Sequence, residues 1–298
     1  MQMKKTVKCS TVRKILAAAA VLSAVSGAIA FDWPQDETSS DSFFSYFGQL
    51  RGGTMGSSLI FRDSSVVKAA DSGHVAIVMT EHNNDYGWFE SPLGNAVVIA
   101  HDADFSTVYG NLDEESLHPE LFDMDTVSVG QEFGESGNSG WQAGQSCLEF
   151  MVLDIKQGLA INPRTSMPKI GKELPLSIGT VSLDDKNGNT HLLVLERNLP
   201  AGKYAVYHTR QDISVPYKTV VSLNGATIES ISYDSMKEMN GKLCVSGNSS
   251  YPSDVVYPDE KRQLLGNVQL HPGLNKLDVA VMDILGGSQN TTYTIEAY

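Results

Sequence analysis

Residues 94–112 read GNAVVIAHDADFSTVYGNL and place two apolar, β-branched runs on either side of a short polar turn. Runs of this kind recur between glycine-containing turns at 66–69, 74–79, 96–100, 106–109 and 148–153. Short strands at this spacing are typical of a mostly antiparallel β fold. We therefore expect a β domain over residues 49–165, preceded by an N-terminal segment at 31–48.

This pattern is interrupted at 162–171, NPRTSMPKIG, by two prolines and a glycine. We expect a domain boundary there, with a linker at 166–175. Strand signals resume over 176–298, where Asn224-Gly225 between two alternating runs predicts a tight hairpin. Seven or so strands in about 120 residues resemble the immunoglobulin-like β-sandwiches appended to bacterial surface enzymes. The expected fold class is all-β, and a spacer or packing role is favoured for the second part.

Composition and charge narrow the classes of function. The chain has 298 residues, 41% of them hydrophobic, and its 22 Lys and Arg against 35 Asp and Glu give a net charge of −13. Such a chain repels polyanions, so nucleic acid is excluded as an expected partner. Its three cysteines form no Cys-x-x-Cys pair, so neither a disulfide framework nor a structural zinc site is expected.

The first 30 residues have the features of a bacterial-type signal peptide. Five Lys and Arg residues precede an apolar stretch at 15–25, and Ala28 and Ala30 fit a small-x-small cleavage site. The apolar stretch is shorter than the roughly 20 residues that a membrane span needs, which argues against an uncleaved anchor. We expect a mature protein that begins near Phe31, has a net charge of −18 and no membrane span, and resides in the periplasm or cell envelope.

Six motifs follow one another between residues 54 and 163. They are VKAADSGHV at 67–75, GNAVVIAH at 94–101, TVYGNL at 107–112, VSVGQEFGESGNSG at 127–140, CLEFM at 147–151 and Asn162-Pro163. Their order and spacing resemble those of the lysostaphin/LytM-type peptidoglycan endopeptidases. That family consists of zinc enzymes built on a small antiparallel β core, the duplicated hybrid motif. The resemblance implies a LytM-like β-sheet domain over 49–165.

The resemblance also implies where the catalytic positions of the family would stand in this chain. Counting back without gaps from the first motif places Thr54 at the first zinc-ligand histidine and Ser58 at the ligand aspartate. Asn111 stands in place of the histidine that stabilises the transition state. Cys147 replaces the catalytic histidine, and Glu149 replaces the third zinc ligand. All five positions therefore differ from the family pattern.

These substitutions remove the chemistry of the family. A hydrolytic zinc needs three protein ligands and an open position for water, and the hydroxyl groups of Thr54 and Ser58 are poor ligands. Loss of one electrostatic stabiliser commonly costs about 10²–10³ in rate. We therefore expect no catalytic residue, no zinc or other cofactor, and a pseudoenzyme.

A groove that has lost its hydrolytic activity can still bind a ligand. Tyr109, Asn111, Trp141 and Glu149 would line it with aromatic, amide and carboxylate groups suited to a peptide or a glycan. Degenerate members of the family activate amidases, so the expected partner is a peptidoglycan peptide, a cell-wall hydrolase or another envelope protein. The expected function is that of a secreted, catalytically inactive LytM-type homologue that acts in the cell envelope.

Two alternatives remain open at this point. One is a peptidoglycan metalloendopeptidase with an altered metal site built on Cys147, Glu149 and His101. The other is a structural scaffold in an envelope assembly. A disulfide between Cys147 and Cys244 is also left open, because the sequence alone cannot establish it.

Overall fold

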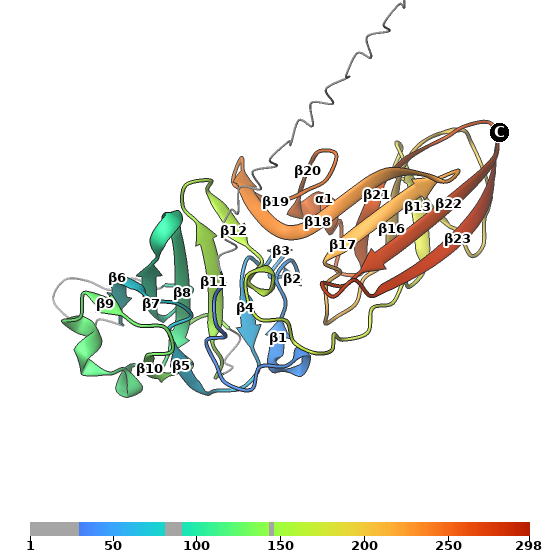
Figure 1. The fold of residues 1–298 in the computed structure, drawn as a ribbon. Helices are drawn as coiled ribbons and strands as arrows, with labels where there is room; N and C mark the ends of the chain where they lie inside the picture. Colours follow the sequence, from blue (N-terminus) through green and yellow to red (C-terminus); the bar gives the residue numbers. More distant parts are fainter. Residues whose placement is uncertain (1–29, 81–90, 143–145) are drawn as a thin grey trace, which may run out of the picture.

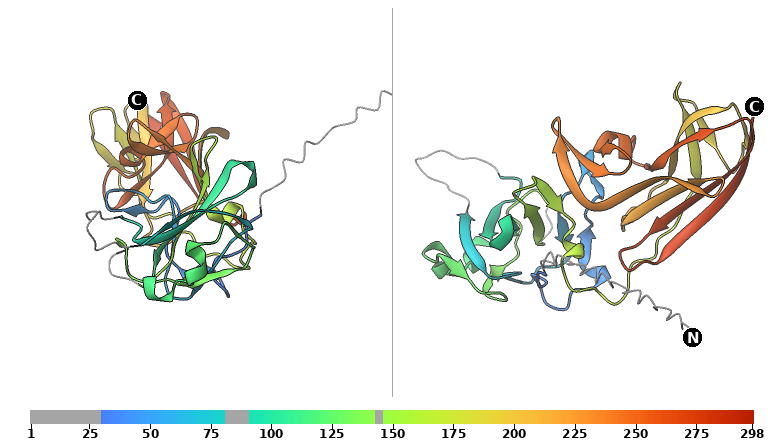
Figure 2. Two further views of the ribbon diagram at one scale, coloured as in Figure 1. Left: turned by 90° about the vertical axis from the view of Figure 1, so that its left-hand side faces the viewer. Right: turned by 45° about the horizontal axis from the view of Figure 1, so that its top comes forward.

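The computed structural model describes residues 30–80, 91–142 and 146–298, and it is built almost entirely of β-strands (Figures 1 and 2). The predicted signal peptide lies outside the described residues, apart from Ala30. No helix in the described part of the chain is long and apolar enough to cross a membrane. The first half contains β1 (Phe43–Ser45), β2 (Leu50–Arg51), β3 (Thr54–Met55), β4 (Leu59–Phe61), β5 (Val66–Lys68), β6 (Gly73–Met79), β7 (Asn95–Ala100), β8 (Phe105–Leu112), β9 (Thr126–Val127), β10 (Glu132–Glu135), β11 (Glu149–Asp154) and β12 (Leu159–Ile161).

The short helices of the first half are 3₁₀ turns between these strands, namely η1 (Ser40–Ser42), η2 (Asp102–Asp104), η3 (Glu114–Ser116), η4 (Pro119–Phe122) and η5 (Pro163–Thr165). The second half contains β13 (Val181–Asp185), β14 (Thr190–Leu192), β15 (Asn198–Leu199), β16 (Gly202–Thr209), β17 (Lys218–Leu223), β18 (Ala226–Met239), β19 (Lys242–Ser246), β20 (Ser250–Pro252), α1 (Ser253–Val256), β21 (Arg262–Leu270), β22 (Gly273–Met282) and β23 (Ser288–Ala297). The mostly β fold expected from the sequence is confirmed in both halves.

The first half is organised around an antiparallel sheet in the order β12-β11-β8-β7-β6-β9. The five runs predicted from alternation are all strands, namely β5, β6, β7, β8 and β11. Phe150 of β11 stands opposite Tyr109 of β8, and both side chains are fully buried. The Tyr109 ring also contacts Phe133 edge-on, with 5.0 Å between the ring centres. This aromatic cluster fixes the register of the strands that carry the candidate site.

The second half consists of two sheets that share one apolar core. One sheet runs β15-β23-β22-β17-β18 and the other β14-β13-β16-β21. Inward residues of both, such as Val206, Val221 and Val279, form a single buried cluster. The predicted hairpin at Asn224-Gly225 is confirmed between β17 and β18. Its two turn residues have φ angles of 53° and 84°, and Asn and Gly tolerate this left-handed region best.

A continuous β ladder joins the two halves. The strand β18 pairs with β17 over its first part, and further along it pairs with β12, where Ala160 stands opposite Met236. Met236 and Tyr257 belong to the same apolar cluster as Phe47 and Met55, and Tyr257 donates a hydrogen bond to the carbonyl of Gly48 at 2.8 Å. Figure 1 shows β19, β20 and α1 beside β2 and β3 of the first half. The second half therefore packs directly against the strand that carries Thr54.

Segment 166–175 is tied down by a buried ion pair. Arg164 binds the carboxylate of Glu173, and both side chains have less than a tenth of their surface exposed. The guanidinium also lies over the ring of Tyr46, 5.3 Å from its centre. Burial raises the pKa of the Tyr46 hydroxyl to about 12. These contacts connect the predicted linker to the N-terminal segment.

Candidate functional site

The structure brings Ser58 and Glu149 together. The strand β4 pairs with β11, and Ile60 stands opposite Glu149 at the start of β11. Ser58, one residue before β4, donates its hydroxyl proton to Oε1 of Glu149 at 2.7 Å. The positions aligned with two zinc ligands of the family therefore hold a hydrogen bond between a hydroxyl and a carboxylate.

Gln142 is a member of this site that the sequence did not reveal. Its Nε2 donates to Oε2 of Glu149 and, at 3.3 Å, to the carbonyl of Pro92. The side chain is 1% exposed, and Oε1 has no hydrogen-bond partner among the described residues. A glutamine in a glycine-rich loop carries no motif, so only the fold shows that it reaches β11.

Asn111 holds the loop at 137–140 against the start of β11. It is fully buried, and its Nδ2 donates to the carbonyls of Gly137 at 2.7 Å and Cys147 at 2.6 Å. Its Oδ1 accepts a hydrogen bond from the amide of Gly140 at 2.8 Å. The φ angle of Asn111 is 63°, a conformation that asparagine adopts more readily than most residues. Asn111 thus positions the backbone around the site and presents no exposed surface to a ligand.

Cys147 is a buried thiol. It has no exposed surface, and removal from water raises its pKa to about 11, although the Asn111 amide and Arg51 act in the opposite direction. The thiolate is the reactive form and the metal-binding form, so Cys147 is neutral and inert near pH 7. Both Cys147 and Cys244 are free cysteines in the structure.

Thr54 lies at the contact with the second half. Thr54 is an exposed residue, and its hydroxyl forms a hydrogen bond with the hydroxyl of Ser253 at 3.1 Å. The same Ser253 oxygen accepts the amide proton of Met55 at 3.4 Å. The C-terminal half therefore engages the position aligned with the first zinc ligand.

Of the two other residues predicted to line the groove, Tyr109 lies in the core and Trp141 lies on the surface. Tyr109 is fully buried, and its hydroxyl accepts a hydrogen bond from the amide of Ala70 at 2.7 Å, so its side chain faces the core and not the predicted groove. Trp141 is 62% exposed, and its carbonyl accepts a hydrogen bond from Arg51 at 3.1 Å. His101 contacts the Ser72 carbonyl at 2.9 Å, and no described contact joins it to Cys147 or Glu149.

These residues do not fit the zinc site that the fold implies. Within residues 30–80, 91–142 and 146–298, no group of three or more His, Cys, Asp or Glu side chains could hold a metal ion. The Ser58 hydroxyl is directed at Glu149, the Asn111 amide nitrogen donates to carbonyls, and Cys147 keeps its proton. A hydrolytic zinc requires three such donors to be free for the metal.

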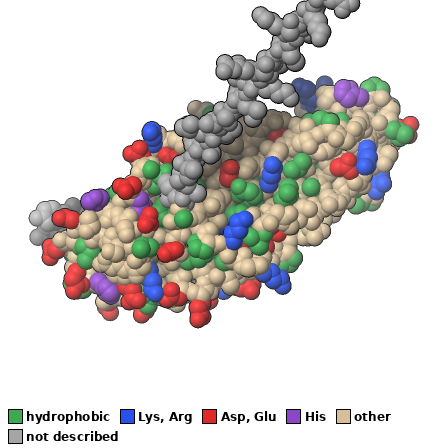
Figure 3. Space-filling model, in the orientation of Figure 1, with side chains coloured by type: hydrophobic (Ala, Val, Ile, Leu, Met, Phe, Trp, Pro, Cys, Tyr) green, Lys and Arg blue, Asp and Glu red, His purple; other side chains and the backbone are tan. Residues whose placement is uncertain are grey.

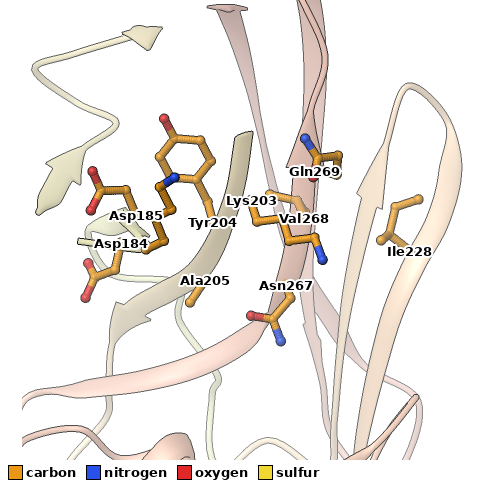
Figure 4. Close-up of a pocket in the computed structure, with 10 residues that line it drawn as sticks. Asp184, Asp185, Lys203, Tyr204, Ala205, Ile228, Asn267, Val268 and Gln269 are labelled. Atoms are coloured by element: carbon orange, nitrogen blue, oxygen red, sulfur yellow. The ribbon is translucent and has the colours of Figure 1, made fainter. Parts of the chain in front are cut away.

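A separate hollow of about 530 Å³ lies on the four-stranded sheet of the second half (Figure 4). Ala205 pairs with Asn267, and Lys203 pairs with Gln269 on the neighbouring strands. The small Ala205 side chain leaves space between these longer ones, and Ile228 of β18 closes one side (Figure 4). A small residue between long ones on a sheet carries no sequence motif, so these residues were not predicted.

Comparison with known proteins identifies the first half. Residues 53–163 match the model of peptidase family M23, and residues 175–298 match a separate family model whose description states no function. An uncharacterized protein of Treponema pallidum (strain Nichols) is 32% identical over 120 residues, which cover 38% of this chain and 79% of the relative.

Two solved structures are also similar to the chain. A zinc-containing peptidase from Vibrio cholerae shares 21% identity, with a TM-score of 0.35, over 47% of this chain and 40% of the peptidase. The SpoIIQ–SpoIIIAH pore-forming complex contains a chain with 18% identity and a TM-score of 0.36, over 48% of this chain and 94% of that one. The motif order, the antiparallel sheet and the family match together show that residues 53–163 form a domain of peptidase family M23.

Proposed function

We propose that this protein is a secreted, catalytically inactive M23 homologue that binds peptidoglycan peptides in the cell envelope. One observation carries the proposal: two of the three positions aligned with zinc ligands, Ser58 and Glu149, are hydrogen-bonded to each other, and Gln142 also donates to Glu149. Among the described residues, such a site lacks the ligand set for a hydrolytic zinc and the imidazoles that serve hydrolysis, while the strands that carry the family motifs are present.

The surroundings of this network support binding. Trp141, next to Gln142, exposes 62% of its surface, and large exposed aromatic side chains often contribute to recognition. Asn111 binds the backbone at Gly137 and Gly140, which anchors the loop leading to Trp141 and Gln142 and lowers the entropy cost of binding there.

The rest of the chain fits this proposal. We propose an immunoglobulin-like β-sandwich for residues 176–298, with residues 49–165 as the peptidase-like domain and 166–175 as the linker. The signal-peptide features of residues 1–30 support export to the periplasm or cell envelope.

The test combines binding and digestion on one sample. Purified protein without the predicted signal peptide is mixed with sacculi in micromolar zinc, and an active M23 endopeptidase is run in parallel. We expect the protein to sediment with the sacculi and to release no soluble muropeptides. Release of muropeptides that Glu149→Ala abolishes would instead favour the metalloendopeptidase with an altered site.

A second candidate function, regulation of a cell-wall hydrolase, is favoured by the charge distribution. Residues 31–165 hold 21 Asp and Glu against five Lys and Arg, whereas residues 166–298 hold 14 against 12. Figure 3 shows acidic side chains gathered over the first half. This surface suits a basic protein partner, whose association would weaken with added salt. Addition of the protein to a purified hydrolase acting on sacculi should then change the rate of muropeptide release.

A further inference from the structure

We infer that the Glu149 carboxylate receives a free primary ammonium group of a peptidoglycan peptide. This inference rests on the proposed function and names the group that the site recognises. It starts from the orientation of the carboxylate. Each oxygen of Glu149 accepts a hydrogen bond from a neutral donor, Oε1 from Ser58 and Oε2 from Gln142. The two donors fix the orientation of the side chain, and neither of them carries a positive charge.

No cation in the described part of the chain neutralises this charge. None of the ion pairs among the described residues includes Glu149, although it is only partly exposed. Arg51 lies close enough to act on Cys147, but its Nη2 donates to the carbonyl of Trp141 at 3.1 Å and no described ion pair joins it to Glu149. A partly buried carboxylate is stabilised by an opposite charge. The geometry thus leaves the neutralisation of the Glu149 carboxylate to a ligand.

A second acceptor beside the carboxylate indicates what kind of cation fits. Gln142 Oε1 is buried and has no partner among the described residues, and it belongs to the amide group whose nitrogen binds Glu149. An unpaired buried acceptor is costly, so a ligand that donates to it gains binding energy. A primary ammonium carries three N–H donors and no acceptor, which matches a site made of acceptors.

Trp141 adds a feature that matches the same ligand. Its exposed indole belongs to the same loop as Gln142, and an exposed indole attracts cations and covers the alkyl chain that carries them. Free primary ammonium groups occur in peptidoglycan on peptides that have not been cross-linked. The site would therefore bind peptides that are not cross-linked more tightly than cross-linked ones.

The experiment compares sacculi before and after N-acetylation of their free amino groups with acetic anhydride. Binding of the same purified protein is measured by sedimentation over a range of sacculus concentrations. We expect the apparent affinity to fall about tenfold or more on acetylated sacculi, the loss typical of one hydrogen-bonded charge pair. Glu149→Gln should bind untreated sacculi as weakly as the wild type binds acetylated ones, and acetylation should not weaken it further.

Two further variants separate the specific role from damage to the fold. Ser58→Ala removes one donor that orients the carboxylate and should give an intermediate loss. Glu135→Gln, an exposed acid on β10, should bind like the wild type. Thermal unfolding measured on each variant identifies any that do not fold.

The outcomes distinguish this inference from the function on which it rests. Equal wild-type binding to both kinds of sacculi would overturn the ammonium site and leave peptidoglycan binding in place. Discrimination that Glu149→Gln retains would overturn the assignment to Glu149. Absence of wild-type binding to either preparation would overturn the proposed function itself.

Discussion

Single residues show how two positions that the family resemblance assigns to the catalytic site contribute to the fold. Asn111 is fully buried and satisfies two carbonyls and one amide of the backbone around the site. Cys147 beside it is a neutral packing residue whose pKa is raised by burial. Both side chains stabilise the fold, and Glu149 supplies the carboxylate of the site.

Asn111→Ala should lower the free energy of unfolding by about 3 kcal/mol. The substitution leaves buried carbonyls without a donor, and alanine is strained at a φ of 63°. Urea denaturation of the purified variants measures the effect. Asn290→Ala, on the exposed side of β23, serves as the matched control and should stay within about 0.5 kcal/mol of the wild type. Equal stability of the two variants would contradict the bracing role of Asn111.

At the scale of elements, the strands follow from sequence patterns and the contacts between distant segments do not. Alternating apolar residues predict β5 to β8 and β11, because a half-buried strand repeats every two residues. The same alternation could not show that β8 is buried on both faces, which places Tyr109 in the core. The pairing of β12 with β18 and the reach of Gln142 to Glu149 both depend on the completed fold.

A histidine in one strand makes the stability of the folded protein depend on pH. His208 lies in β16 and is 1% exposed, and burial lowers its pKa from 6.5 to about 4. The unfolded chain binds a proton at this residue below pH 6.5, while the folded chain binds it only near pH 4. Stability is therefore complete above pH 6.5 and falls as the pH drops towards 4, by up to about 3 kcal/mol.

The pH dependence can be isolated by substitution. His208→Gln keeps a polar side chain that does not titrate, so its unfolding free energy should vary less between pH 7 and pH 4 than that of the wild type. His271→Gln, on an exposed position of the second half, is the matched control. Parallel curves for the wild type and His208→Gln would show that this histidine does not contribute.

At the scale of the whole molecule, a shared sheet joins the two halves, and a buried ion pair holds the segment between them against the N-terminal segment. Glu173→Gln should destabilise the protein by roughly 3 kcal/mol, because it leaves the Arg164 charge buried without its partner. The double substitution Arg164→Met with Glu173→Leu removes both charges and should recover much of this loss. Thermal unfolding of the single and double variants measures the coupling. A double variant less stable than Glu173→Gln would contradict it.

The ladder between β12 and β18 also has a mechanical consequence. Its three paired positions, Leu159 with Lys237, Ala160 with Met236 and Ile161 with Ser235, form part of one sheet that runs through both halves. A force that pulls the halves apart must break these hydrogen bonds together with the apolar contacts around Met236. We expect the molecule to bear tension as a single stiff body, so that a displacement at Tyr298 is transmitted to the site around Glu149.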